Sequence, residues 1–317
     1  MTASTTQADA LHVAFGCDVG YLIGAAAAVQ SLLSRHEDRV HLHLLASPEV
    51  GDEVRDYFDG RCRTYGATLH WHVVDRELPG KKQSHLFRLL IAELIDPEID
   101  RILYLDSDLV VLDDLSPIFE LDTGDAVCAA ALDYLFPTMG LADNGNPKRS
   151  AAGFVGDEPY VNTGVLLVRP QKWRERNVTE RALAVFDEHK DYLNMVDQDA
   201  LNLLLKGDLH VLDARWNLQL YSLRRPPAHL TSGRRLLDDL VAAAENPAIA
   251  HFTGKAKPWN GQDLRNPFRP AFHEALLAAD FLDDAEARQQ RKLRTKHRLL
   301  KPINLIKPWR QSPTAAA

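Results

Sequence analysis

Short apolar segments alternate with helical patterns through the N-terminal part of this 317-residue chain. Strands are predicted at 11–15, 40–46, 68–74, 101–105 and 125–131, with helices around 21–33, 49–60 and 84–95. Strands that alternate with helices build βαβ units, so the sequence predicts an α/β fold with a mostly parallel central sheet. Ligands of such sheets bind beyond the carboxyl ends of the strands. Asp18 and Asp106 each follow a predicted strand, so we expect both at that edge.

The rest of the chain is less regular. Residues 133–159 are rich in glycine and proline and are predicted to form a long loop or lid. A strand is expected at 160–168, helices around 171–189 and 197–206, and a short strand at 249–252. The three cysteines are too few and too widely spaced for a disulfide framework, so we expect free thiols in a reducing compartment.

The charge is unevenly distributed. The whole chain carries −7, but residues 287–317 contain nine Lys or Arg and no acid, which leaves −16 for the residues before them. These basic residues are mixed with Leu, Ile and Trp309, a pattern typical of segments on anionic membrane surfaces; a solvated basic tail is the alternative. An acidic body without a nucleic-acid motif argues against nucleic-acid binding. With no signal peptide or spanning segment in the sequence, we expect a cytoplasmic protein, peripheral on the inner face of the plasma membrane.

Asp106-Ser107-Asp108 directly follows the apolar segment RILYL. In an extended chain, residues two apart point to the same face, so the two carboxylates would converge. Adjacent carboxylates repel unless a cation lies between them, and oxygen ligands suit Mg²⁺ or Mn²⁺. Read alone, the pattern is more typical of a solvated acidic loop than of a metal site.

A second polar cluster is HFTGKAKPW, residues 251–259. Gly254 permits close approach of the backbone to a ligand, and Lys257 supplies positive charge. His251 is a candidate third metal ligand, although a lone histidine at a strand end is often structural. Together with Asp106 and Asp108 it would hold a metal that bridges two phosphates, and the imidazole favours Mn²⁺ over Mg²⁺.

These motifs carry a family resemblance. The chain is similar to the retaining glycosyltransferases of family eight, especially bacterial lipopolysaccharide galactosyl- and glucosyltransferases. The matching segments occur in family order over about 11–275: the first strand through Tyr21, SHLFRLLIAEL, LYLDSDLVVLDDL, YVNTGVLLVRPQKW, DQDALN, ARWN and HFTGKAKPW. The chain departs from the family at Val19, Gly20 and Leu86, where polar or tyrosine side chains are frequent.

The resemblance implies a GT-A, Rossmann-like nucleotide-sugar fold at 11–280, flanked by a disordered N-terminus (1–10) and the basic tail (281–317). It implies transfer of a hexose, glucose or galactose, from a UDP-sugar to a glycan, lipopolysaccharide-type or lipid-linked acceptor, with the α configuration kept. By matching position, the Mn²⁺ ligands are Asp106, Asp108 and His251; the uridine contacts are Asp18 and Tyr21; the diphosphate contacts are Gly254 and Lys257; and the donor-sugar contacts are Arg88, Asn162, Asp197 and Gln198.

Several of these residues have structural alternatives. Asp197 could cap a helix, Asn162 could form a turn before Gly164, Arg88 could make a surface ion pair and Tyr21 could belong to the core.

Gln198 matches the β-face position of the donor sugar. Its amide is a poor nucleophile, so we expect same-face attack rather than a covalent intermediate. Asp133 is a further candidate for orienting the acceptor. Two other functions remain open from the residues alone: a non-catalytic UDP-sugar-binding or regulatory protein, and a metal-dependent phosphohydrolase.

Overall fold

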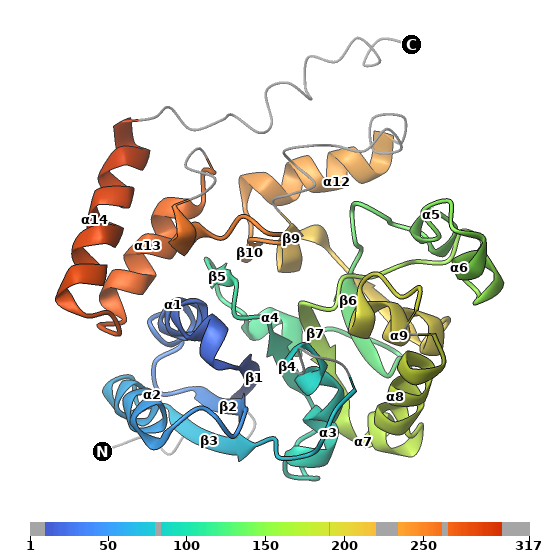
Figure 1. Ribbon diagram of the computed structural model, residues 1–317, viewed down its shortest axis with the longest axis horizontal. Coiled ribbons are helices and arrows are strands. Elements are labelled where there is room, and N and C mark those ends of the chain that lie inside the picture. The colour runs from blue at the N-terminus through green and yellow to red at the C-terminus, as the bar shows by residue number, and fades with distance from the viewer. Residues whose placement is uncertain (1–9, 80–83, 190, 220–233, 262–265, 300–317) are drawn as a thin grey trace. The chain divides into compact units, whose positions relative to one another are not determined.

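The computed structural model in Figure 1 describes residues 10–79, 84–189, 191–219, 234–261 and 266–299. The chain divides into two compact units: Met1–Leu22, His36–Asp106 and Asp114–Leu212 form the first, and Ile23–Arg35, Ser107–Asp113 and Asp213–Ala317 form the second. Most of the predicted disordered N-terminus and the tail beyond residue 299 lie outside the described residues. Within the described part of the chain, no helix is long and apolar enough to cross a membrane.

The described residues of the first unit form one seven-stranded sheet with the order β3-β2-β1-β4-β7-β6-β8. The strands are β1 (Leu11–Cys17), β2 (Val40–Ala46), β3 (Thr68–Val73), β4 (Ile102–Leu105), β6 (Cys128–Ala131), β7 (Val165–Val168) and β8 (Leu209–Leu212). β3, β2, β1 and β4 run parallel, β7 is antiparallel to both of its neighbours, and β6 pairs parallel with β8. The predicted α/β fold with a mostly parallel sheet is confirmed.

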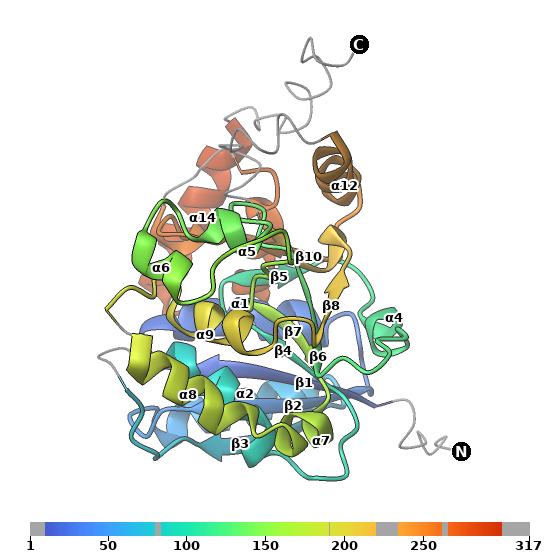
Figure 2. The ribbon, with the colours of Figure 1, turned by 90° about the vertical axis from the view of Figure 1, so that its right-hand side faces the viewer.

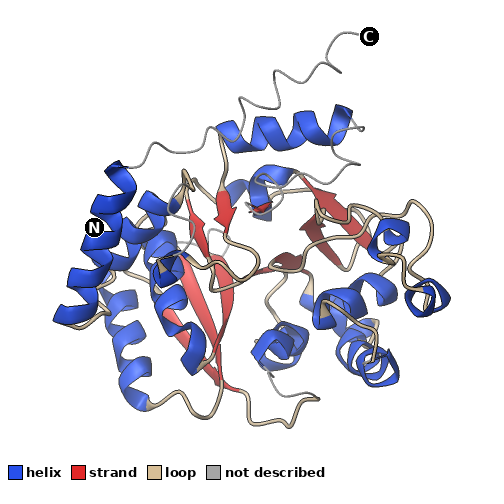
Figure 3. Cartoon of the chain, turned by 45° about the horizontal axis from the view of Figure 1, so that its top comes forward, coloured by secondary structure: helices blue, strands red, loops and turns tan. Residues whose placement is uncertain are grey.

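Helices alternate with these strands along the chain. Figure 3 shows the helices in blue and the strands in red. The helices are η2 (Val19–Tyr21), α2 (Asp52–Thr64), η3 (Ser84–Leu90), α3 (Ile91–Leu94), α4 (Ser116–Phe119), α5 (Met139–Ala142), α6 (Pro147–Ala151), α7 (Pro170–Glu175), α8 (Val178–His189) and α9 (Val196–Leu204).

The main core lies between one face of the sheet and η3, α3, α7, α8 and α9, and Figure 2 shows α7 and α8 along this side. Leu86, Ile91, Trp173 and Leu201 are all buried there. This packing fixes η3 and the start of α9, the two elements that carry Arg88 and Asp197.

Three predictions from the sequence were wrong in detail. The segment 84–95 begins as a 3-10 helix, and the helical pattern at 171–189 is broken between α7 and α8, where Asn177 has φ +50°. The predicted lid at 133–159 contains two short helices, α5 and α6, which begin at the side-chain caps of Thr138 and Asn146. Their apolar residues have a core of their own, so this segment is packed.

The described residues of the second unit contain a three-stranded sheet with the order β5-β10-β9. Its elements are α1 (Leu22–Leu33), β5 (Leu109–Val111), η4 (Ala214–Asn217), β9 (Leu218–Gln219), α12 (Arg234–Glu245), β10 (Ile249–His251), η5 (Pro258–Asn260), α13 (Arg269–Ala278) and α14 (Asp284–Leu299). β10 is antiparallel to β5, so its last residue, His251, is paired with Leu109, the residue after Asp108. The helix α14 covers the first part of the predicted basic tail.

Candidate active site

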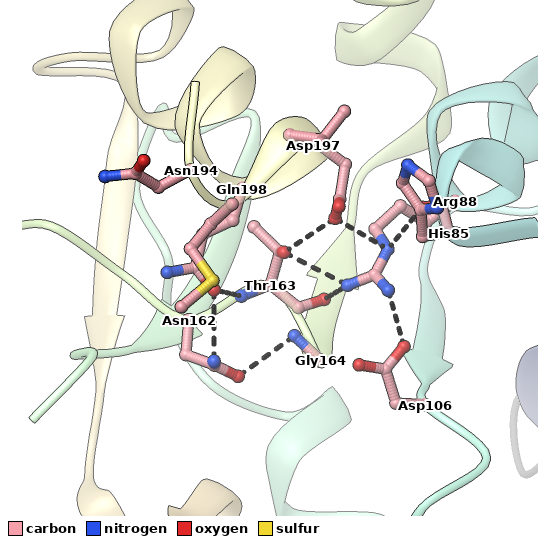
Figure 4. Close-up of a pocket in the computed structure, with 11 residues that line it drawn as sticks. His85, Arg88, Asp106, Asn162, Thr163, Gly164, Asn194, Asp197 and Gln198 are labelled. Atoms are coloured by element: carbon pink, nitrogen blue, oxygen red, sulfur yellow. Dashed lines mark hydrogen bonds and ion pairs between the residues drawn. The ribbon is translucent and has the colours of Figure 1, made fainter. Parts of the chain in front are cut away.

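A polar pocket of about 240 Å³ opens in the first unit where β4 ends and β7 begins (Figure 4). Its lining comes from η3, the end of β4, the residues before β7 and the start of α9: His85, Arg88, Asp106, Asn162, Thr163, Gly164, Asn194, Met195, Val196, Asp197 and Gln198. The pocket therefore brings together five residues predicted from the sequence: Arg88, Asp106, Asn162, Asp197 and Gln198.

Arg88 is the centre of the charged part of this pocket and is only 6% exposed. Its guanidinium donates to Asp106 Oδ1 at 2.6 Å, and its Nε pairs with Asp197 Oδ2 at 3.1 Å. It also donates to the carbonyl and hydroxyl oxygens of Thr163, at 2.6 and 3.0 Å. Arg88 is therefore buried and does not make the surface ion pair that was the alternative. The two carboxylates compensate the cost of burying its charge.

Asp197 does not cap α9, because the N-cap residue is Met195. Its carboxylate instead accepts from the Thr163 hydroxyl at 3.0 Å and pairs with Arg88. Asp199 satisfies the backbone at the helix start, accepting from the N–H groups of Asn194 and Met195. The side chain of Asp197 therefore faces the pocket.

A chain of amide contacts crosses the other side of the pocket. Asn162 Nδ2 donates to Gln198 Oε1 at 3.0 Å, and Gln198 Nε2 donates to Asp133 Oδ2 at 2.9 Å. Asn162 Oδ1 also accepts from Gly164 N–H at 3.1 Å, so the turn predicted as an alternative is present as well. Burial raises the pKa of Asp133, although the hydrogen bonds from Gln198 and the backbone oppose this shift. Asp133 thus contacts Gln198, which lines the pocket, but is not itself one of the lining residues.

Tyr21 is the last residue of the short helix η2 that follows β1, and Asp18 is the N-cap residue of that helix. Asp18 Oδ1 accepts from Tyr21 N–H at 3.0 Å, and its other oxygen accepts from the Ser84 hydroxyl. Tyr21 is 41% exposed, so it is not a core residue. β1 and β4 are parallel neighbours with Phe15 opposite Leu105, which confirms that Asp18 and Asp106 follow the same ends of adjacent strands.

The second unit gathers Asp108, His251 and Lys257 into a buried cluster. His251 Nε2 is 3.1 Å from Asp108 Oδ1, and Lys257 Nζ donates to Asp108 Oδ2 and to the Phe252 carbonyl. His251 Nδ1 lies 2.9 Å from Asn217 Oδ1, which orients the ring so that Nε2 faces Asp108. Burial acts to raise the pKa of Asp108, but the charges of His251 and Lys257 outweigh it and hold the pKa below its ordinary value.

Glycines shape the backbone of this second unit. Gly254 has φ +85°, which a residue with a side chain adopts only with strain. A Cβ on Gly24 would lie 2.4 Å from the Ser107 carbonyl oxygen and 3.0 Å from Trp259. The segment that carries Asp108 therefore packs on α1 at a distance that only glycine permits.

Asp106 belongs to the first unit and Asp108 to the second, and Ser107 joins them. The chain turns at Ser107 and Asp108 instead of continuing as the extended segment we predicted. Chain geometry alone still keeps the two Cα atoms within about 7 Å of each other. Two carboxylates and an imidazole suit a divalent cation such as Mn²⁺ or Mg²⁺. Because Asn217 contacts Nδ1 of His251, Nε2 is the ring nitrogen that would act as a metal ligand.

Sequence reasoning missed two residues with clear positioning roles. Thr163 contacts both Arg88 and Asp197, and Asn217 orients His251. Both lie within segments that carried the family resemblance, YVNTGVLLV and ARWN, so that resemblance was the available signal.

The segment expected to be a lid is held by a buried ion pair. Arg149 of α6 makes two hydrogen bonds to Asp199 of α9, at 2.7 and 2.8 Å, and Tyr160 donates to the same carboxylate at 2.6 Å. The Arg149 guanidinium also lies 4.0 Å from the centre of the Phe154 ring. This cluster fastens α6 to the helix that presents Asp197 and Gln198.

Comparison with known proteins gives a consistent result. The sequence model of glycosyl transferase family 8 matches residues 12–263. General stress protein A of Bacillus subtilis is 35% identical over 266 residues, covering 75% of this chain and 87% of that protein. Lipopolysaccharide glucosyltransferase WaaO of Escherichia coli is 28% identical over 287 residues, covering 87% and 80%.

Among solved structures, the galactosyltransferase LgtC in complex with donor and acceptor sugar analogues is similar, with a TM-score of 0.73 and 24% identity over 88% of this chain and all of LgtC. At this identity the similarity shows the fold, which is of the GT-A type.

Proposed function

Because this chain belongs to glycosyl transferase family 8 and is therefore a glycosyltransferase, we propose that it transfers a hexose, glucose or galactose, from a UDP-sugar to a glycan or lipid-linked glycan. The observation that carries this proposal is the pocket, which collects Arg88, Asn162, Asp197 and Gln198 from three separate parts of the sequence. Its paired donors and acceptors suit the hydroxyl groups of a sugar. The relative that is a lipopolysaccharide glucosyltransferase supports a lipopolysaccharide-type acceptor.

Each part of the donor has candidate partners. Arg88, Asn162 and Asp197 would contact the hydroxyl groups of the hexose, and the exposed Tyr21 beside Asp18 would contact the uridine. Gly254 and Lys257 would contact the diphosphate. Lys257 is buried with a carboxylate partner, so its charge is held in place before the substrate binds.

We assign Asp106, Asp108 and His251 as ligands of Mn²⁺, with Mg²⁺ as the alternative. When bound, the cation would neutralise charge on the diphosphate leaving group. The ammonium of Lys257 assists the same charge separation by attracting the departing diphosphate. No protein acid is then needed to protonate the leaving group.

We further propose that the product keeps the α configuration by attack of the acceptor on the same face from which the diphosphate leaves. Gln198 donates its amide to Asp133 and accepts from Asn162, so its side chain is fixed. It would support developing positive charge on the sugar through its amide oxygen, rather than form a bond to it. The departing diphosphate oxygen would take the acceptor proton. Asp133 fixes the amide of Gln198 and is thereby a positioning residue.

The test is a donor screen with UDP-glucose, UDP-galactose and UDP-N-acetyl sugars and Mn²⁺, measured as UDP release with and without an acceptor. We expect release from one hexose donor and faster release with a lipopolysaccharide-type acceptor. NMR coupling constants of the product should show an α linkage, and Gln198→Ala should keep measurable activity. A β-linked product would refute retention, whereas a covalent sugar trapped on Gln198 would refute same-face attack alone.

The basic tail carries a separate proposal, peripheral attachment to the inner face of the plasma membrane, where a lipid-linked acceptor lies. The described part of α14 presents Arg288, Arg291 and Lys292, and each basic residue near an anionic surface contributes about 1 kcal/mol. Co-sedimentation of the full chain with anionic liposomes should be lost at high salt and in a chain ending at residue 286. Equal binding by both chains would contradict attachment through the tail.

A further inference from the structure

The first three strands of the first unit carry five histidines on one face, outside the candidate active site. They are His12 on β1, His41 and His43 on β2, and His70 and His72 on β3. We refer to these five residues as the histidine ladder. In the parallel register His12 lies opposite His41 and His43 lies opposite His70, and side chains two apart on a strand share a face. The sequence pattern HLHLL followed by LHWHV therefore places four imidazoles on two neighbouring strands.

The rings contact one another along the diagonals between strands. His12 Nδ1 lies 3.0 Å from His43 Nε2, and His43 Nδ1 lies 3.1 Å from His72 Nε2. His41 Nδ1 lies 3.1 Å from His70 Nε2. The rings are also stacked, with 4.4 Å between the ring centres of His43 and His70. Each of the three hydrogen bonds needs one ring nitrogen without a hydrogen.

The ladder is uncharged at neutral pH. Burial, aided by the neighbouring imidazoles, lowers the pKa of His12 to about 4 and that of His43 to about 2. Burial also lowers the pKa values of His41, His70 and His72. Neutral imidazole is the form that binds metal ions, so these rings are ready to act as ligands without losing a proton.

The spacing of the ring nitrogens matches that of two ligands on one metal ion. Zinc–imidazole bonds are about 2.0–2.1 Å long, which places two nitrogen ligands roughly 3.0–3.4 Å apart. His41 Nδ1 and His70 Nε2 are 3.1 Å apart. Both rings are partly exposed, whereas His43 is 2% exposed, so an ion can reach the His41–His70 pair. The carboxylate of Asp96 is close enough to favour positive charge at His70 and His12.

We propose that the histidine ladder binds one divalent transition-metal ion of the class that prefers imidazole, such as Zn²⁺, Ni²⁺ or Cu²⁺, between Nδ1 of His41 and Nε2 of His70. The ring that donates the present hydrogen bond moves its hydrogen to its other nitrogen, so both facing nitrogens become ligands and no proton is lost. Water would complete the coordination. This site differs in ligand chemistry from the carboxylate-rich candidate site, which suits Mn²⁺ or Mg²⁺.

The experiment uses the full chain without an oligohistidine tag and measures bound Zn²⁺ per chain by equilibrium dialysis. His41→Gln and His70→Gln should each remove one Zn²⁺ per chain or lower the affinity of that site for Zn²⁺ at least about tenfold. The loss of a group that only supports a ligand already lowers metal affinity by about that factor, so the loss of a ligand should lower it at least as much. His210→Gln is the matched control, because His210 is a partly exposed histidine on β8, at the other edge of the same sheet. Asp108→Asn identifies any Zn²⁺ held at the candidate active site, and its loss should be additive with that of His41→Gln.

Spectroscopy tests the ligands without any substitution. Cu²⁺ bound to the wild-type chain should show electron paramagnetic resonance splitting from at least two imidazole nitrogens, and the splitting should lose one nitrogen in His70→Gln. Thermal unfolding without metal establishes that the variants fold. If His41→Gln and His70→Gln bind as many Zn²⁺ ions as wild type with unchanged affinity, or if His210→Gln loses as much, the ladder is only a packed hydrogen-bonded cluster and the proposal is wrong.

Discussion

One sheet of the first unit supports two polar clusters, of which the pocket cluster carries charge and the partly buried histidine ladder does not. At the pocket, the Arg88 guanidinium lies between the carboxylates of Asp106 and Asp197. On β1–β3, the histidine ladder joins its rings by hydrogen bonds without charge. Arginine does not lose its proton within proteins, so its burial requires paired anions, whereas histidine escapes the cost of burial by becoming neutral.

The difference determines how each cluster responds to pH. The pKa of His43 lies at about 2, below its ordinary value of 6.5, so the unfolded chain takes up a proton that the folded chain does not as the pH falls below 6.5. The ladder therefore adds stability above that pH and loses it on acidification. Asp133 behind the pocket has a raised pKa, so its contribution has the opposite sign and is lost as the pH rises.

The largest effect on the rate of transfer should come from neutralising one of the proposed metal ligands, Asp106 or Asp108. This tests whether catalysis depends on the charged residues and not on the histidine ladder. Asp106→Asn or Asp108→Asn should lower transfer by at least about 10²–10³-fold, because the cation that would neutralise the developing charge on the diphosphate is no longer held. The measurement is Mn²⁺-dependent UDP release, with His43→Gln as the control that should remain active. Near-normal turnover in either aspartate variant would contradict the metal assignment.

The same substitutions should also lower stability. Asp106 pairs with Arg88 and Asp108 with Lys257, so each loss leaves a buried cation without one of its anions.

Buried and surface ion pairs in the same unit provide the second test. Arg88→Met should lower the free energy of unfolding by about 3–5 kcal/mol, because Asp106 and Asp197 lose their buried partner. Arg76→Met is the control, since Arg76 pairs with Glu93 and Glu180 at the surface and such pairs contribute about 0–1 kcal/mol. Urea unfolding measures both. Equal losses would mean that the pocket network is no more stabilising than a surface pair.

Lys257→Ala tests a buried charged residue of the second unit. We expect transfer to slow about 10²-fold, the scale of losing one electrostatic contact to a leaving anion. Lys255→Ala is matched in charge and segment but removes an exposed lysine, and it should leave turnover almost unchanged. If both variants slowed transfer equally, a diffuse positive potential would be responsible rather than the fixed ammonium.

The smallest effect should be visible only in how steeply the free energy of unfolding changes with pH. In His43→Gln, the loss of unfolding free energy between pH 6.5 and 5 should be shallower than in wild type by up to about 1.4 kcal/mol per pH unit, the value for one proton. Urea unfolding at a series of pH values without added metal measures this slope. His210→Gln should keep the wild-type slope, and an unchanged slope in His43→Gln would show that the ladder does not resist protonation.

The sequence predicted the parallel strands well, because short apolar segments bounded by polar ones have few alternative structures. It also predicted the residues that follow strands, such as Asp18 and Asp106, since their place depends only on where a strand ends. The direction of β7 was not predictable from its apolar sequence, which suits either orientation. Thr163 and Asn217 were missed because their roles depend on partners 34 to 75 positions away along the chain.

The reversal of β7 has a consequence for how this scaffold can vary. In a wholly parallel sheet, only residues that follow strands reach the carboxyl edge, but here Asn162, Thr163 and Gly164 reach it by preceding one. Asp106 N–H donates to the Gly164 carbonyl at 2.8 Å, so the entry to β7 is fastened to the exit of β4. The connection between β6 and β7 is therefore fixed where it enters β7, and Arg149 of α6 is bonded to the buried Asp199 of α9. A segment that replaced α5 and α6 would have to supply a cation at the place of Arg149, because otherwise α9, which presents Asp197 and Gln198, would lose the partner of its buried carboxylate.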